Sequence, residues 1–212
     1  IKLMLNDWKL ATERTLKAGY DFIEIHGAHG YLISSWLSST SNQRTDEYGG
    51  SFENRIRLLL EIIDTVRSVW PASKPLALRL SCTEHADEVG GWNNEDTLRL
   101  VPYLIEHGVD ILDCSTGGNY SKAKYHPLQN YQVQFSANVK KAYGNKISTI
   151  TVGKILSGPQ AEDILQRDEA DLIAIGRGFL INPQFAVQAA RDLKANIALS
   201  PQYQWSTAVV PI

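Results

Sequence analysis

The sequence predicts an α/β fold of the (β/α)8-barrel type (a TIM barrel), of which the chain carries only the C-terminal five βα units. Short apolar runs with strand character alternate five times with longer amphipathic segments, and no low-complexity linker separates them. Similar phrases, KAGYDFIEI, EHGVDILDC and RDEADLIAI, lead into three of the strands, which indicates stacked equivalent units. Repeated βα units also suit an open doubly wound sheet, but no GxGxxG follows any strand, so the barrel is favoured.

The expected elements follow this alternation along the chain. A first helix, already under way at the start of the chain, is expected to end at Gly19. The strands are expected at residues 21–26, 76–81, 110–115, 147–152 and 171–176, and the helices at residues 52–69, 94–107, 132–143, 158–166 and 183–193. Ser51 followed by Asn54, and Asn94 followed by Thr97, are the expected start signals of two of these helices.

Composition limits the class of partner. The 212 residues carry a net charge of −2 and no run rich in Lys and Arg, so neither a nucleic acid nor a membrane surface is expected to bind. No apolar stretch approaches the roughly 20 residues that span a bilayer, and no basic-then-apolar leader opens the chain. Cys82 and Cys114 form no CxxC and are too few for a disulfide scaffold, which favours the cytoplasm. We expect one domain over residues 1–212 that binds a small molecule.

Arg79 lies inside the strand phrase PLALRLS, between leucines. A buried guanidinium without a partner is costly because it loses its hydration, so Arg79 needs a strongly accepting partner. One candidate is an inward acidic residue, Glu24 or Asp113. The other is an electron-rich ligand atom, such as the N1–C2=O edge of a reduced flavin. The sequence leaves both interpretations open.

The last two strands end in ITVGKI and AIGRGF. In barrels these two positions commonly form a phosphate site from glycine N–H groups with a cation nearby. Gly153 and Gly176 permit close approach of a ligand, and Lys154 or Arg177 supplies the charge. A glycine after a strand usually marks only a turn, but two such glycines, each followed by a basic residue, favour a phosphate site.

HGAHGYL, residues 26–32, directly follows the first strand. His29 and Tyr31 fall in a loop and are not expected in the core, whereas His26 can also be a satisfied core histidine. Two neighbouring imidazoles can donate hydrogen bonds to one substrate oxygen and so polarise a carbonyl or nitro group. The phenol can then deliver a proton.

A zinc site is the rival interpretation of the same histidine pair. HxxH can ligate zinc, but such sites usually need a third protein ligand. The remaining histidines, His85, His107 and His126, stand at no recognisable spacing, so no metal is expected.

HGAHGYL and the LSSTSNQRTDEYGGSFENRIRLLLEII that follows it closely resemble the Old Yellow Enzyme family of FMN-dependent NAD(P)H oxidoreductases. Its members carry a His-x-x-His or His-x-x-Asn pair, a Tyr two residues later and an N-x-R-x-D-x-Y-G-G-S-x-x-N-R stretch. The resemblance continues through LALRLS, DILDCSTG, TVGKI and DLIAIGRGFLINP and covers essentially the whole chain. The histidine pair most resembles the YqjM-like branch of ene-reductases.

The resemblance implies a role for each matching position. His26 and His29 match the pair that binds the oxygen of the substrate's activating group, and Tyr31 matches the tyrosine that protonates the α-carbon. Arg79 matches the arginine at flavin N1 and O2. The groups that hold the FMN phosphate in the family are matched by Val152, Gly153, Gly176 and Arg177. The residue pattern also places Lys154 at this phosphate site. One further loop matches the family, and we interpret it as an internal network of ion pairs and hydrogen bonds with a structural role. Its matching residues are Asn42, Arg44, Asp46, Tyr48, Asn54 and Arg55.

The resemblance also implies an activity. The expected enzyme binds FMN, takes hydride from NADPH or NADH and reduces the C=C bond of alkenes activated by a carbonyl or nitro group. Two alternatives stay open: a truncated, non-catalytic remnant that cannot bind FMN alone, and a metal-dependent barrel hydrolase that uses His26 and His29.

The first three strands of the family barrel have no counterpart here, since the chain begins at the helix before the fourth. Such a chain leaves two sheet edges with unpaired N–H and C=O groups, which invite aggregation or pairing. We therefore expect a fragment of a longer enzyme or a truncated product. YqjM-like members have an arginine near the C-terminus that reaches a neighbouring subunit, whereas PQYQWSTAVV offers Trp205 instead. A homo-oligomer and a missing N-terminal segment both stay open as partners.

Overall fold

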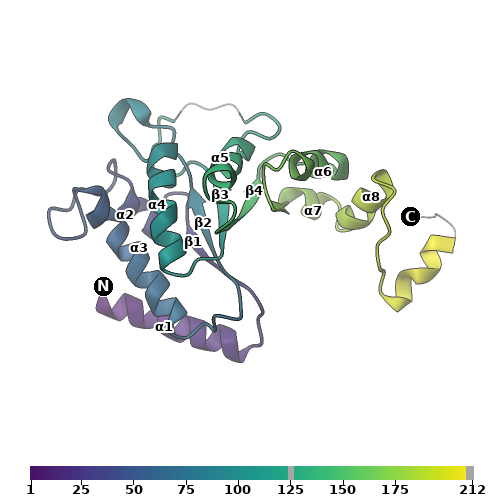
Figure 1. Cartoon of the computed structure of the whole chain (residues 1–212), viewed down its shortest axis with the longest axis horizontal. Coiled ribbons are helices and arrows are strands. Elements are labelled where there is room, and N and C mark those ends of the chain that lie inside the picture. The colour runs from purple at the N-terminus through teal and green to yellow at the C-terminus, as the bar shows by residue number, and fades with distance from the viewer. Residues whose placement is uncertain (124–126, 209–212) are drawn as a thin grey trace.

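The computed structural model describes residues 1–123 and 127–208 (Figure 1). Five parallel strands form one sheet in the sequential order β1–β2–β3–β4–β5. The strands are β1 (Ile23–Gly27), β2 (Leu76–Ser81), β3 (Ile111–Ser115), β4 (Ser148–Val152) and β5 (Leu172–Ala174). A doubly wound sheet reverses its strand order at a switch point, and the described strands contain no such reversal. The order is that of five consecutive barrel units and confirms the predicted fold class.

The helices follow the strands as expected, with short additions. The helices are α1 (Lys2–Lys17), α2 (Leu32–Leu37), α3 (Phe52–Arg67), α4 (Asn94–Glu106), α5 (Val133–Tyr143), α6 (Gly158–Gln166), α7 (Arg177–Ile181) and α8 (Phe185–Asp192). Two 3-10 helices, η1 (Asp87–Val89) and η2 (Pro201–Ala208), accompany them. The sequence did not predict α2, α7, η1 or η2. No helix of the described residues is both long and apolar enough to cross a membrane.

One predicted helix start is confirmed and the other is wrong by one residue. The Ser51 hydroxyl accepts a hydrogen bond from the Asn54 N–H at 3.3 Å and caps α3. The cap of α4 is Asn93, not Asn94, because the Asn93 side chain accepts from the N–H of Asp96 while the Asp96 carboxylate accepts from the N–H of Asn93. This reciprocal capping box satisfies two N–H groups that a helix start otherwise leaves unpaired.

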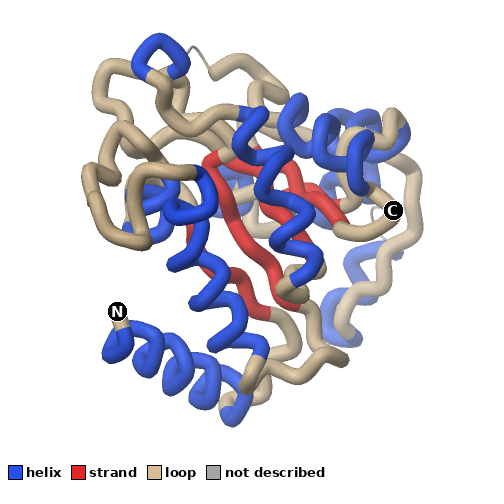
Figure 2. The backbone as a smooth tube through the Cα atoms, turned by 60° about the vertical axis from the view of Figure 1, so that its left-hand side comes forward, coloured by secondary structure: helices blue, strands red, loops and turns tan. Residues whose placement is uncertain are grey.

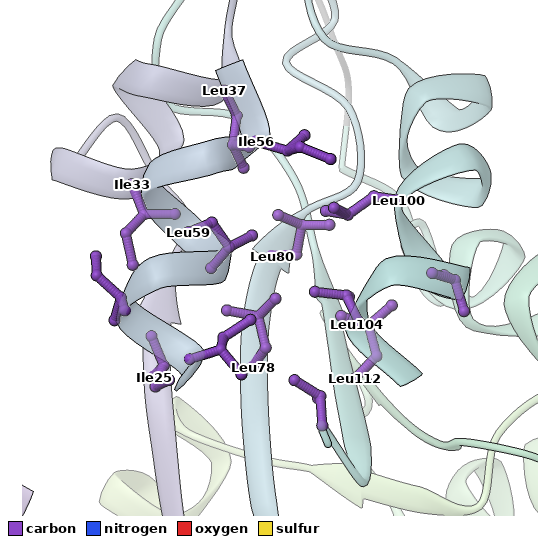
Figure 3. Close-up of a cluster of buried hydrophobic side chains, with 14 of the residues drawn as sticks. Ile25, Ile33, Leu37, Ile56, Leu59, Leu78, Leu80, Leu100, Leu104 and Leu112 are labelled. Atoms are coloured by element: carbon purple, nitrogen blue, oxygen red, sulfur yellow. The ribbon is translucent and has the colours of Figure 1, made fainter. Parts of the chain in front are cut away.

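The core lies between the sheet and the helices on its outer face (Figure 2). Successive strand residues point to opposite faces, so Leu78, Leu80 and Leu112 face α3 and α4, where they are buried (Figure 3). Helix α3 contributes Ile56 and Leu59 to the same cluster. The alternate strand residues face away from the helices, on the inner face of the sheet, and carry the polar groups described below.

The loop between α2 and α3 is held by its own hydrogen bonds. The Asn42 amide donates to the carbonyl oxygens of Trp36 and Tyr48, at 2.7 and 2.8 Å. The Arg55 Nε donates to the Leu37 carbonyl at 2.7 Å, and Arg44 pairs with Asp46. These contacts agree with the structural interpretation of this loop.

Candidate active site

The sheet register brings three polar residues of the inner face into one row. His26 of β1 pairs with Arg79 of β2, and Arg79 pairs with Asp113 of β3. Residues paired across neighbouring strands point to the same face, so the three side chains are neighbours close to the C-terminal ends of their strands. In barrels these ends hold the ligand site.

His26, His29 and Tyr31 gather at the end of β1, as the HGAHGYL motif predicts. The ring centroids of His26 and His29 are 5.2 Å apart, and those of His26 and Tyr31 are 5.5 Å apart. His29 reaches this position through a left-handed backbone conformation, with φ of 62°. The Tyr31 side chain is 67% exposed, so its hydroxyl is open to an incoming molecule.

His29 is fixed by the ends of the two neighbouring strands. Its backbone N–H donates to the Ser81 hydroxyl at 2.9 Å, and its Nε2 lies 2.7 Å from the Ser115 hydroxyl. Gly118 packs directly against the same backbone, because a Cβ at Gly118 would lie 2.1 Å from the His29 carbonyl carbon. Sequence reasoning missed Gly118, since nothing near it in the sequence signals contact with a loop almost ninety positions earlier.

Both histidines are held neutral at pH 7. Burial lowers the pKa of His29 to about 4, with the Arg79 charge and then His26 adding to the effect. Burial and the Arg79 charge also lower the pKa of His26. A neutral imidazole has one N–H donor. When the Ser115 hydroxyl donates to Nε2 of His29, the N–H of the His29 ring is at Nδ1. The pair can therefore donate to an acceptor oxygen at the end of β1.

Arg79 has an acidic partner that satisfies only part of its guanidinium group. Its Nη1 lies 3.4 Å from Oδ2 of Asp113, so Asp113 is the ion-pair partner among the two acidic residues predicted. Nε of Arg79 and Oδ1 of Asp113 are buried and have no hydrogen-bond partner among the described residues. A buried unpaired donor is costly, so Nε of Arg79 is available to an electron-rich ligand atom.

Glu24, the other predicted partner, forms no ion pair among the described residues. Burial and then the Asp113 charge raise its pKa to about 7, against the opposite effect of Arg79. Burial also raises the pKa of Asp113. The inner face therefore holds one cation, Arg79, whose charge acts on two neighbouring carboxyl groups.

The predicted phosphate residues end two adjacent strands. Val152 of β4 pairs with Ala174 of β5, and Gly153 and Gly176 follow these strands. Gly153 has φ of 117°, and a Cβ there would lie 2.7 Å from the Tyr131 ring, so only glycine fits.

Gly176 has open space where a side chain would be, which leaves its backbone accessible. The adjoining cations, Lys154 and Arg177, are exposed, and no ion pair of the described residues includes either. Both charges are therefore available to an anion.

Gln132 is a second residue that sequence reasoning missed. It is buried at the start of α5, where its Oε1 accepts from the Thr116 hydroxyl at 2.7 Å and its Nε2 donates to the Val152 carbonyl at 2.9 Å. Gln132 therefore ties the end of β3 to the end of β4. Its neighbours in the sequence give no local pattern that would have identified this role.

The described residues contain no group of three His, Cys, Asp or Glu side chains placed to hold a metal ion. His107 lies away from the site, with Nδ1 2.6 Å from Oδ1 of Asp64. His126, the last histidine considered in the zinc interpretation, lies outside the described residues. In the described part of the chain, the histidine pair thus has no third ligand for the hydrolase chemistry.

Comparison with known proteins gives consistent matches. A model of the NADH:flavin oxidoreductase / NADH oxidase family matches residues 1–196. An NADH:flavin oxidoreductase of Gibberella zeae is 42% identical over 97% of this chain and 52% of that protein, and an NADPH dehydrogenase of Bacillus subtilis is 43% identical over 96% and 58%. The solved structure of morphinone reductase in complex with tetrahydroNAD is 27% identical, with a TM-score of 0.69 over 94% of this chain and 51% of that chain. The chain spans about half the length of the relatives it matches.

Proposed function

The chain belongs to the NADH:flavin oxidoreductase / NADH oxidase family, the Old Yellow Enzyme family, and on this premise we propose that it forms part of an FMN-dependent NAD(P)H oxidoreductase that reduces the C=C bond of alkenes activated by a carbonyl or nitro group. The neutral histidine pair beside Tyr31 carries the proposal. We further propose that residues 1–212 form one domain, the C-terminal portion of the flavin-binding barrel.

The residues present fit FMN. The unpartnered Nε of Arg79 suits the N1–C2=O edge of the flavin, which becomes more negative on reduction. Backbone groups of Val152, Gly153 and Gly176 suit its phosphate. The side chains of Lys154 and Arg177, which form no ion pair with other described residues, add positive charge there. Bound FMN would supply the hydride, which NADPH or NADH restores.

The protein's own residues account for the rest of the chemistry. His26 and His29 donate hydrogen bonds to the oxygen of the activating group and so favour negative charge on it. A neutral imidazole, the protonation state at pH 7 described above, keeps one N–H for this purpose. Tyr31, an exposed residue whose ring centroid lies 5.5 Å from that of His26, delivers the proton to the α-carbon.

Replacing Tyr31 by Phe tests this assignment. We expect Tyr31→Phe to slow alkene reduction by roughly 10²-fold or more, because the proton donor is lost. NADPH oxidation by oxygen needs no such proton and should survive. Stopped-flow absorbance of the two half-reactions measures both. Tyr20→Phe, at an exposed tyrosine before β1, is the matched control and should change neither rate. Equal loss of both activities in Tyr31→Phe contradicts the role.

The second candidate is a non-catalytic remnant that cannot bind FMN alone. The open sheet favours it, since β1 and β5 are both edge strands in the described part of the chain. FMN titration of the 212-residue chain, followed by flavin fluorescence, separates the two. Saturable binding that Arg79→Met weakens supports the oxidoreductase. A folded chain that stays colourless supports the remnant.

A further inference from the structure

Glu84 is a buried carboxylate behind the HGAHGYL loop. It lies in the loop after β2, is 1% exposed, and takes part in no ion pair of the described residues. A buried carboxylate without a cation persists only where hydrogen bonds replace its hydration. The surroundings of its two oxygens therefore decide what else must bind there.

The two oxygens of Glu84 differ sharply. Oε1 accepts three hydrogen bonds, from the hydroxyls of Ser38 and Thr40 at 2.8 and 3.1 Å and from the N–H of Trp92 at 2.9 Å. These three donors satisfy Oε1. Oε2 is buried and has no partner among the described residues. A buried carboxyl oxygen in this position requires a hydrogen-bond partner that the described side chains do not supply.

A small cavity adjoins this carboxyl group. Its volume is about 10 Å³, and Glu84, Ser34, Ser81 and Asn119 form the polar part of its wall. Leu37 and Leu80, both labelled in Figure 3, form the apolar part. A water molecule needs a cavity of about 10 to 15 Å³ with two to four polar partners, so the space has room for one water molecule and nothing larger.

Ser34 offers the second partner that such a water requires. Its hydroxyl oxygen accepts from the N–H of Gly30 at 3.3 Å and from the Asn119 amide at 3.0 Å. No hydrogen bond described for this serine uses the hydroxyl hydrogen, which is therefore available as a donor. A water between Ser34 and Glu84 can accept from the one and donate to the other.

We propose that this cavity is a binding site for one internal water molecule, which accepts from the Ser34 hydroxyl and donates to Oε2 of Glu84. We propose further that Glu84 is a positioning residue for residues 29–40. The water connects Glu84 to Ser34, which holds Gly30, and Oε1 holds Ser38 and Thr40 at the other end of α2. The segment that carries His29 and Tyr31 is thus tied at both ends to one buried carboxyl group. This inference does not depend on FMN.

A crystal structure of the wild-type chain tests the water directly, because it requires no variant. We expect one peak of density in the cavity, at hydrogen-bond distance from Oε2 of Glu84 and from Oγ of Ser34. An empty cavity overturns the proposal. A peak with the short distances and higher coordination of a metal ion also overturns it.

Two variants test the positioning role through the titration of His29, followed by NMR of the labelled imidazole. Ser34→Ala removes the donor to the water, and Glu84→Gln turns the unpartnered acceptor into a donor. In both, the loop is less firmly held, so we expect the His29 midpoint to rise from about 4 towards the usual 6.5. We also expect the Tm to fall by about 2 to 8 °C.

The direction of the change separates positioning from simple electrostatics. Replacement of Glu84 by the neutral Gln cannot raise the pKa of His29 by electrostatics alone, whereas release of the loop raises it, and Ser34→Ala changes no charge. Ser39→Ala is the control. The Ser39 hydroxyl lies in the same loop as Ser38 and Thr40 but donates to the Gly90 carbonyl at the surface. A His29 midpoint that stays unchanged or falls in both variants, as in the control, overturns the positioning role.

Discussion

Glu24 gives the inner face of the sheet a carboxyl group that titrates near neutral pH. Its pKa is about 7 in the folded protein against the ordinary 4.5, chiefly because of burial and then the charge of Asp113. Between these two values the folded protein keeps a proton that the unfolded chain has released. Stability from this proton is therefore full below pH 4.5 and is lost as the pH rises through about 7.

Glu24→Gln should remove this pH dependence. We expect the free energy of unfolding of the variant to fall less than that of the wild type between pH 4.5 and about 7, as measured by urea unfolding at several pH values. Asp113→Asn should move the loss to lower pH, because it removes the negative charge that opposes ionisation of Glu24. An identical pH profile for wild type and Glu24→Gln would show that Glu24 titrates normally.

At the scale of single residues, the sequence predicts which residues belong to the site better than it predicts which residues they contact. The gathering of His26, His29 and Tyr31 follows from their proximity in one motif after one strand. For Arg79 the sequence proposes two acidic partners, and only the register between β2 and β3 selects Asp113. Their roles in catalysis stay predictions.

The capping box of α4 is the element-scale feature with the clearest test. Asn93→Ala removes the acceptor for the N–H groups of Glu95 and Asp96, which lie 2.9 and 3.1 Å from Oδ1 of Asn93. We expect a loss of about 1 kcal/mol and a fall in Tm of about 2 to 4 °C, measured by thermal unfolding.

Asn94→Ala is its matched control. Oδ1 of Asn94 is buried without a partner among the described residues, and alanine is the better helix former. We expect this substitution to be neutral or stabilising. Equal destabilisation by Asn93→Ala and Asn94→Ala would contradict the assignment of the cap.

The length of an element decides how well the sequence predicts it. The long helix α3 and the buried strand β2 were predicted to within two residues, because seven positions of the helix repeat one pattern and the strand is mostly apolar. Helices α2 and α7 have six and five residues, too few for a helical period to repeat, and both were missed. Strand β5 is shorter than predicted, because ladder pairing ends at Ala174.

On the scale of the whole molecule, the two faces of the sheet differ in what covers them. The outer face lies under the helices and carries the main core, whereas the inner face carries the row of polar residues and exposed apolar groups. Phe22, beside β1, is 41% exposed, and Leu172 of β5 is 46% exposed. These residues stand at the two edge strands of the described sheet. An exposed edge with apolar side chains beside it favours association with another chain.

We expect the 212-residue chain to self-associate through this inner face and its edges. Leu172→Lys places a charge on the inner face of β5 and should weaken association by about tenfold, because burial of one leucine contributes about that much to binding. Sedimentation equilibrium over a range of protein concentrations measures the change. Leu180→Lys is the control, since Leu180 is 84% exposed on α7 and lies outside the sheet. A purely monomeric wild type would leave the open face without a role in assembly, and equal weakening by both substitutions would place the contact elsewhere.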